Sequence, residues 1–151
     1  MAGHTFSHHV LHVIFSTKQR RPLIRPDWRT RLYEYLCGIA RQEFGCAMAV
    51  GGTDNHIHGL LSIRTDIAIA DALRKWKSLS SRWIHETYPA ERLFAWQAGY
   101  GSFGVSSSNE EKVKAYILDQ ERHHHTRTFE EEFVELLRRH KVDYDPRYVF
   151  D

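Results

Sequence analysis

Two histidines separated by one residue, His56 and His58, lie in the short apolar run TDNHIHGLLSI at residues 53–63. An ordinary half-buried strand would carry aliphatic side chains at both positions. In a β-strand alternate side chains share a face, so Ile57 would point the other way and the two imidazoles would lie about 6.5 to 7 Å apart. That separation suits two ligands of one metal ion.

A second pair of reactive side chains, Tyr116 and Gln120, is four residues apart in AYILDQ. A helix would stack them on one face, with a nucleophilic hydroxyl one turn from an amide oxygen. Val113 and Ile117 share that face, so Tyr116 could equally be a core residue of an amphipathic stripe and Gln120 a residue at its border. Either pair taken alone leaves chemistry and packing open.

The apolar spacing and the turn signals predict the elements that would position these side chains. They are a strand at 8–17, a helix at 25–45, two strands within 46–63 around the turn GGTDN, a helix at 66–88, a strand or strand pair at 93–107, a helix at 107–125 and a terminal helix at 128–140. Ser108 and Glu111 predict a capping box at the start of the helix over 107–125. The order predicts an α+β fold, a split βαβ sheet of the ferredoxin or RRM type that is antiparallel and backed by helices.

Length and composition bound the class of protein. At 151 residues, with 42% hydrophobic and 13% aromatic content, residues 1–151 are expected to form one domain with a substantial core. The longest apolar stretches are far below the ~20 residues of a membrane span, and no cleavable leader opens the chain, so we expect a cytoplasmic protein without membrane contact. Cys37 and Cys46 match neither a metal-binding pair nor a disulfide framework.

Basic residues gather in two stretches. From Lys18 to Arg41 there are seven Lys or Arg against Asp27 and Glu34, and a second basic stretch runs from residue 74 to 82. Trp28, Trp76 and Trp83 are interleaved with them, as expected where a protein contacts a phosphate backbone and exposed bases. The alternative is a solvated helix face with tryptophans in the core. The residues predicted to contact DNA are Lys18, Arg20, Arg21, Lys75, Lys77 and Arg82.

Other proteins with a His-x-His strand fit poorly, because no third alternating histidine and no mostly-β pattern is present. A strand with His-x-His followed by a helical Tyr-x-x-x-Gln resembles the single-tyrosine transposases of the HUH endonuclease superfamily and the related REP-associated tyrosine transposases. The resemblance covers nearly the whole chain. It is carried by HVIFSTKQRRPLI, DNHIHGLLSI, LRKWKSLSSRWI, GYGSFGVSSS and, most specifically, YILDQERHHHTRTFEEEFVELLRRH.

The resemblance implies a metal-dependent single-stranded DNA transposase. His56, His58 and Gln120 would hold one divalent ion, Mg²⁺ or Mn²⁺. Tyr116 on the catalytic helix would attack the scissile phosphate to form a 5′-phosphotyrosine and free a 3′-OH. The implied partners are single-stranded or hairpin DNA and a second copy of the chain, in a homodimer whose tyrosine helix completes the His56 strand of its partner. When bound to DNA the protein would be associated with the nucleoid.

Two alternatives remain. One is a host-recruited protein that binds REP-type hairpins, and the other is a non-catalytic RRM-like nucleic-acid-binding module, of which GYGSFGV is a faint echo without the basic opening residue. The remaining motifs favour structural roles. His123, His124 and His125 could form a metal cluster but are predicted to be helix-end histidines. His12 could line the sheet face near the site but is predicted to be a hydrogen-bonded core histidine. The glycines at 99, 101 and 104 are predicted to be strand kinks or bulges.

Overall fold

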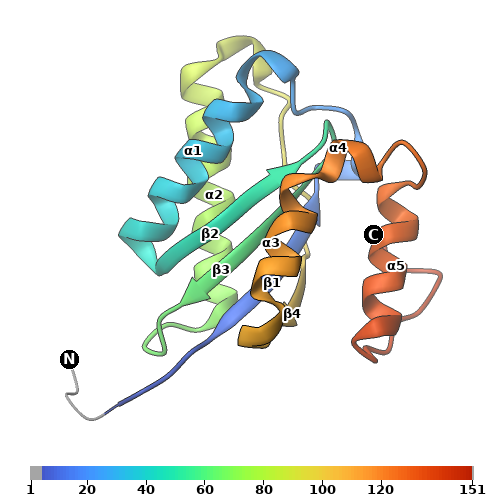
Figure 1. Cartoon of the computed structure of the whole chain (residues 1–151). Helices are drawn as coiled ribbons and strands as arrows, with labels where there is room; N and C mark the ends of the chain where they lie inside the picture. The colour runs from blue at the N-terminus through green and yellow to red at the C-terminus, as the bar shows by residue number, and fades with distance from the viewer. Residues whose placement is uncertain (1–4, 151) are drawn as a thin grey trace.

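Four strands pair into one antiparallel sheet in the computed structural model, which describes residues 5–150 (Figure 1). The sheet order is β2-β3-β1-β4, built from β1 (Val10–Ser16), β2 (Gly45–Gly52), β3 (His56–Ile63) and β4 (Gly101–Gly104). Because β3 pairs antiparallel with both β1 and β2, it is inserted between two parallel strands. The predicted split βαβ fold is confirmed.

Two long helices, α1 (Pro26–Glu43) and α2 (Ile69–Thr87), cover one face of the sheet (Figure 1). The central strands send alternate side chains into this layer, among them Phe15 and Ile57, both fully buried. Trp76 is fully buried against them and donates a hydrogen bond from its indole nitrogen to the carbonyl oxygen of Leu36 at 2.9 Å. This layer is the main hydrophobic core.

Of the two interpretations left open for the tryptophans, base stacking is wrong for two of them. Trp28 and Trp76 are 2% and 0% exposed, because both lie on the faces of α1 and α2 that meet the sheet. Trp83 is partly exposed and stacks on Tyr35 of α1, with ring centroids 4.7 Å apart. The core alternative therefore holds for Trp28 and Trp76.

Three helices cover the other face: α3 (Glu110–Leu118), α4 (Gln120–His123) and α5 (Phe129–Arg139). The amphipathic α5 packs Phe133 against Ile14 of β1 and Phe103 of β4. α3 crosses β2 so closely that a Cβ on Gly51 would overlap the carbonyl oxygen of Ile117. This glycine lets the helix approach the sheet.

The single helix predicted for 107–125 is interrupted. Asp119 has φ −113° and ψ 30°, outside the helical region, so α3 ends at Leu118 and α4 begins at Gln120. The predicted capping box at Ser108 does not form, since Ser107–Asn109 is a 3₁₀ turn and Asn109 is the N-cap. A capping box does form at the start of α5, between Thr128 and Glu131.

The glycine-rich segment before α3 forms one short strand rather than a pair. Gly101 and Gly104 are the two ends of β4, and their pairing with β1 is regular, so the prediction of kinks or bulges there is wrong. The register shift in the sheet lies in β2, between Ala47 and Ala49. The remaining short elements are 3₁₀ turns at Lys18–Arg20 and Pro89–Glu91. No helix in residues 5–150 is both long enough and apolar enough to cross a membrane.

Candidate metal and nucleophile site

The histidine pair lies on the face of β3 that meets α3, α4 and α5. His56 and His58 are both 0% exposed, while Ile57 between them enters the opposite core, as the alternation predicts. His12 of the neighbouring strand β1 is 4% exposed, and its Nε2 lies 2.7 Å from Nδ1 of His58. His12 is thus a hydrogen-bonded core histidine, and it also orients a member of the pair.

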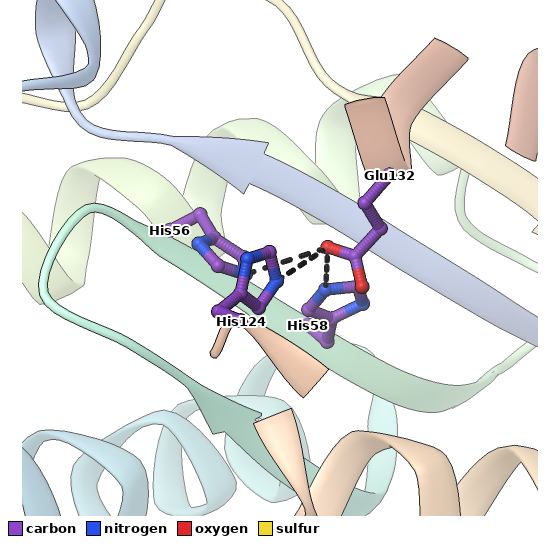
Figure 2. Close-up of side chains that lie close together, drawn as sticks. All are labelled: His56, His58, His124 and Glu132. Carbon is purple, nitrogen blue, oxygen red and sulfur yellow. Dashed lines mark hydrogen bonds and ion pairs between the residues drawn. The ribbon is translucent and has the colours of Figure 1, made fainter. Parts of the chain in front are cut away.

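A carboxylate from α5 faces the histidines. Glu132 is 0% exposed, and its Oε1 lies 2.9 Å from His58 Nε2, 3.0 Å from His124 Nε2 and 3.5 Å from His56 Nε2 (Figure 2). One potential ligand atom from each of these four residues lies within 4.8 Å of all the others. Three imidazoles and a carboxylate are a donor set that fits a divalent transition-metal ion.

Gln120 also directs its amide oxygen into this group. Its Oε1 lies 3.1 Å from His56 Nε2 and 3.1 Å from His124 Nε2, and the side chain is buried, with 2% exposure. The amide nitrogen donates to the backbone carbonyl of Tyr116 at 3.2 Å. The structure therefore brings the predicted ligand to the predicted histidines, although Tyr116 and Gln120 stand on separate helices.

The hydroxyl of Tyr116 lies beside the cluster, held by two residues of the C-terminal segment. It donates a hydrogen bond to Glu132 Oε2 and accepts one from Arg127 Nη2 at 2.6 Å. A cavity of about 400 Å³ opens next to this hydroxyl, between α3 and α5. Its lining includes His12, Lys112, Tyr116, Arg127, Glu135 and Arg139.

Burial sets the protonation states around the cluster. It lowers the pKa of His12 and that of His56 to about 3, so both imidazoles are neutral near pH 7. Burial alone would raise the pKa of Glu132, but hydrogen bonds from His124 and His58 outweigh it and hold this pKa well below its usual range. Burial and the hydrogen bond to Glu132 raise the pKa of Tyr116, which Arg127 opposes. The site thus combines a buried carboxylate anion with a protonated tyrosine.

Two members of the cluster depart from the sequence interpretation. His124 was predicted to be a helix-end histidine, but it turns into the site and its ring lies 4.4 Å from that of His56. The sequence reasoning missed Glu132. The signal for it was an acidic residue within the apolar stripe of α5, between Phe129 and Leu136.

The six residues predicted to contact DNA fall into two groups. Lys18, Arg20 and Arg21 follow β1, where Lys18 and Arg21 are exposed and Arg20 donates to the carbonyl oxygen of Phe150 at 3.0 Å. The other three residues, Lys75, Lys77 and Arg82, lie on α2.

The ammonium group of Lys77 is already occupied. It donates to the carbonyl oxygens of Gln97 at 2.6 Å and of Gly99 at 2.8 Å, and burial lowers the pKa of Lys77 to about 8. On the same helix, Lys75 pairs with Glu43 at 3.6 Å. The six residues therefore do not form a single continuous basic surface.

Fold and site together define an α+β protein with a buried histidine and carboxylate cluster beside a tyrosine hydroxyl. Residues 5–120 match the model of the family described as "Transposase IS200 like", and the chain belongs to this family of DNA-processing enzymes. The resemblance found in the sequence is thereby confirmed. His124, Arg127 and Glu132 lie beyond the matched residues.

Known proteins agree with this assignment. The ISDra2 transposase TnpA of Deinococcus radiodurans is 27% identical over 114 residues, which cover 72% of this chain and 81% of the relative. A solved structure of a candidate transposase from D. radiodurans R1 has a TM-score of 0.63 at 21% identity, covering 78% of this chain and 94% of that one. A REP-associated tyrosine transposase bound to a REP hairpin has a TM-score of 0.54 at 13% identity, covering 78% and 70%. The two solved structures share the fold.

Proposed function

We propose that this protein is a metal-dependent transposase that cleaves and rejoins single-stranded DNA through Tyr116. The observation that carries the proposal is the position of the tyrosine hydroxyl. It is hydrogen-bonded to Glu132, whose other carboxylate oxygen faces His58 and His124. A phosphate at this place would meet the nucleophile and the metal ligands together.

His56, His58 and Gln120 would hold the divalent ion, Mg²⁺ or Mn²⁺. When bound, that ion supplies polarisation of the scissile phosphate and neutralisation of its charge. The donor set supports this role, because burial keeps His56 neutral and the Gln120 oxygen points at its Nε2.

The protein's own residues would manage the nucleophile. The Tyr116 oxygen attacks phosphorus and its proton is released to solvent, while Glu132 Oε2 accepts the hydroxyl hydrogen bond and orients the oxygen. The new bond joins the tyrosine oxygen to phosphorus, the bond to the 3′-oxygen breaks, and that oxygen takes up a proton from solvent. Arg127, which donates to the hydroxyl oxygen, would stabilise the developing phenolate. Attack by another 3′-OH on the 5′-phosphotyrosine reverses these steps and rejoins DNA.

Hairpin DNA is the proposed substrate, because one of the structural neighbours is bound to a REP hairpin. The test is incubation with a single-stranded hairpin and Mn²⁺, followed by a denaturing gel. Wild type should form a covalent adduct, and Tyr116→Phe should bind the hairpin without forming one. Hairpin binding by wild type without any adduct would instead fit the host-recruited binding protein, and an undiminished adduct in Tyr116→Phe would exclude Tyr116 as the nucleophile.

We also propose a homodimer as the working unit, with each protomer using its own tyrosine. Within the single chain α3 packs on β2 at Gly51 and Tyr116 contacts Glu132, so we propose self-contained sites in place of the shared sites that the resemblance implies. A mixture of the double variant His56→Ala, His58→Ala with Tyr116→Phe should stay inactive. Restored adduct formation would demonstrate exchange of α3 between protomers, and a monomeric mass with DNA bound would exclude the dimer.

A further inference from the structure

We propose that the C-terminal segment completes the metal centre, with Glu132 and His124 as ligands in addition to His56, His58 and Gln120. The inference rests on the proposed metal-dependent function and concerns residues beyond the family match at 5–120. It assigns to α5 a part in the active site, rather than only a part in covering the sheet.

The distances between the potential ligand atoms suit a single metal ion. Around one small divalent ion with ligand bonds of about 2.0 to 2.2 Å, neighbouring ligand atoms lie roughly 2.9 to 3.5 Å apart, from octahedral to tetrahedral geometry. The Glu132 Oε1 atom lies 2.9 Å from His58 Nε2, 3.0 Å from His124 Nε2 and 3.5 Å from His56 Nε2. Each histidine is therefore spaced from the carboxylate oxygen as a fellow ligand of one ion would be, and the four ligand atoms all lie within 4.8 Å of one another.

The negative charge of the buried Glu132 carboxylate also favours a bound cation. A buried carboxylate is costly unless cations or hydrogen bonds compensate it. Within residues 5–150, the ion pairs of Glu132 are to the three histidines and to Arg127, whose Nη2 is 3.9 Å from Oε2. Arg127 makes a closer pair with Glu135, which also lines the cavity. A divalent cation at Oε1 would supply the missing positive charge.

This ligand set has a consequence for the choice of metal. His56, His58 and Gln120 alone would be an uncharged set, whereas Glu132 adds one negative charge and His124 a third imidazole. Imidazole-rich sites with one carboxylate favour Mn²⁺ and the later divalent transition metals over Mg²⁺, which prefers oxygen ligands and water. We therefore expect tighter binding of Mn²⁺ than of Mg²⁺, and a metal-dependent attachment of α5 to β3.

Hydrogen exchange on the wild-type protein tests the attachment without any substitution. Adding Mn²⁺ to chelator-treated protein should slow amide exchange in residues 129–139 of α5 by about tenfold or more, because the ligated helix opens less often. Slower exchange in β3 and α4 alone, with α5 unchanged, would overturn the inference.

Calorimetric titration of Mn²⁺ into substituted proteins provides the second measurement. Glu132→Gln keeps the shape but removes the charge, and we expect about 10- to 100-fold weaker binding, with a similar loss for His124→Ala. The matched controls are Glu130→Gln on the same helix and His125→Ala beside His124, and both should stay within about twofold of wild type.

The same titration separates failure of the inference from failure of the proposed function. If His56→Ala loses Mn²⁺ binding while Glu132→Gln and His124→Ala retain it, the inference is overturned and the proposed function stands. If wild type binds no Mn²⁺, or forms the tyrosine adduct equally well in EDTA, the proposed metal-dependent function fails together with the inference.

Discussion

Tyr116 and Glu132 are joined by a hydrogen bond from the tyrosine hydroxyl to the carboxylate, across the gap between α3 and α5. The other oxygen of the same carboxylate lies 2.9 Å from His58 Nε2. One side chain thus connects the candidate nucleophile with the candidate metal ligands. The reactivity of Tyr116 is therefore expected to depend on residues of the C-terminal segment.

Arg127 should make Tyr116 easier to deprotonate. Its guanidinium lowers the pKa of Tyr116 against the effects of burial and of Glu132. We expect Arg127→Gln to slow adduct formation about 10- to 100-fold near pH 7, and the rate to recover as pH rises toward the higher pKa.

The control for Arg127 is Arg122→Gln. Arg122 is exposed and pairs only loosely with Asp119, at 3.5 Å. Single-turnover rates measured from pH 6 to 10 provide the comparison. Equal rates for Arg127→Gln and wild type across that range would show that Arg127 does not assist the deprotonation of Tyr116.

The metal-free protein should lose stability in mild acid. His12 and His56 have a folded-state pKa of about 3 because of burial, below the ordinary value of 6.5, so between these values the unfolded state binds more protons than the folded state. Stability is therefore complete above about pH 6.5 and falls as pH drops toward 3, by about 2 kcal/mol per histidine at pH 5.

Urea unfolding in EDTA at pH 7.5 and at pH 5 measures this loss. The lowered pKa of Glu132 acts in the same direction below its ordinary range, because its ionised form is the one that the fold stabilises. His12→Asn should reduce the number of protons taken up on unfolding by about one, so the free energy of unfolding should change less steeply with pH. His125→Asn, at an exposed position, should leave that slope unchanged. A free energy of unfolding that does not change between the two pH values would contradict the burial account.

Gly51 should be intolerant of a side chain. An added Cβ would overlap the Ile117 carbonyl oxygen, so Gly51→Ala must displace α3 and with it Tyr116. We expect a loss of adduct rate of about tenfold or more and a stability cost of roughly 1 to 3 kcal/mol.

Gly38→Ala is the matched control, since a Cβ at Gly38 meets no atom within 4 Å and alanine favours the helix α1. Thermal unfolding and the gel assay on both variants provide the measurements. Tight packing of α3 on β2 would be disproved by a Gly51→Ala protein as stable and as active as wild type.

Salt dependence should separate the two basic groups. Lys18 and Arg21 are exposed near the end of β1, so Lys18→Ala and Arg21→Ala should each reduce the slope of log affinity against log salt by about 0.7 for single-stranded DNA. Lys77→Met should leave the slope unchanged and lower stability, because its ammonium binds backbone carbonyls. Filter binding of single-stranded DNA at about 50 to 300 mM salt measures these slopes and shows which lysines and arginines contact DNA. A reduced slope for Lys77→Met would instead show that Lys77 contacts DNA.

The histidine pair was predictable from sequence because strand alternation operates within three residues. Tyr116 and Gln120 were predictable as neighbours from their spacing of four, even though Asp119 breaks the helix between them. Glu132 was not, because its approach to His58 depends on how α5 returns across the sheet, a contact between residues 74 positions apart. The position of His124 was not predictable either, because the direction of its side chain depends on where α4 ends.

Mass spectrometry of the covalent adduct, after nuclease and protease digestion, tests most directly whether Tyr116 is the DNA-linked nucleophile. We expect a nucleotide phosphate attached to the oxygen of Tyr116 in wild type, formed with Mn²⁺ and absent in EDTA. A nucleotide attached to any other residue, or an adduct of equal yield in Tyr116→Phe, would contradict it.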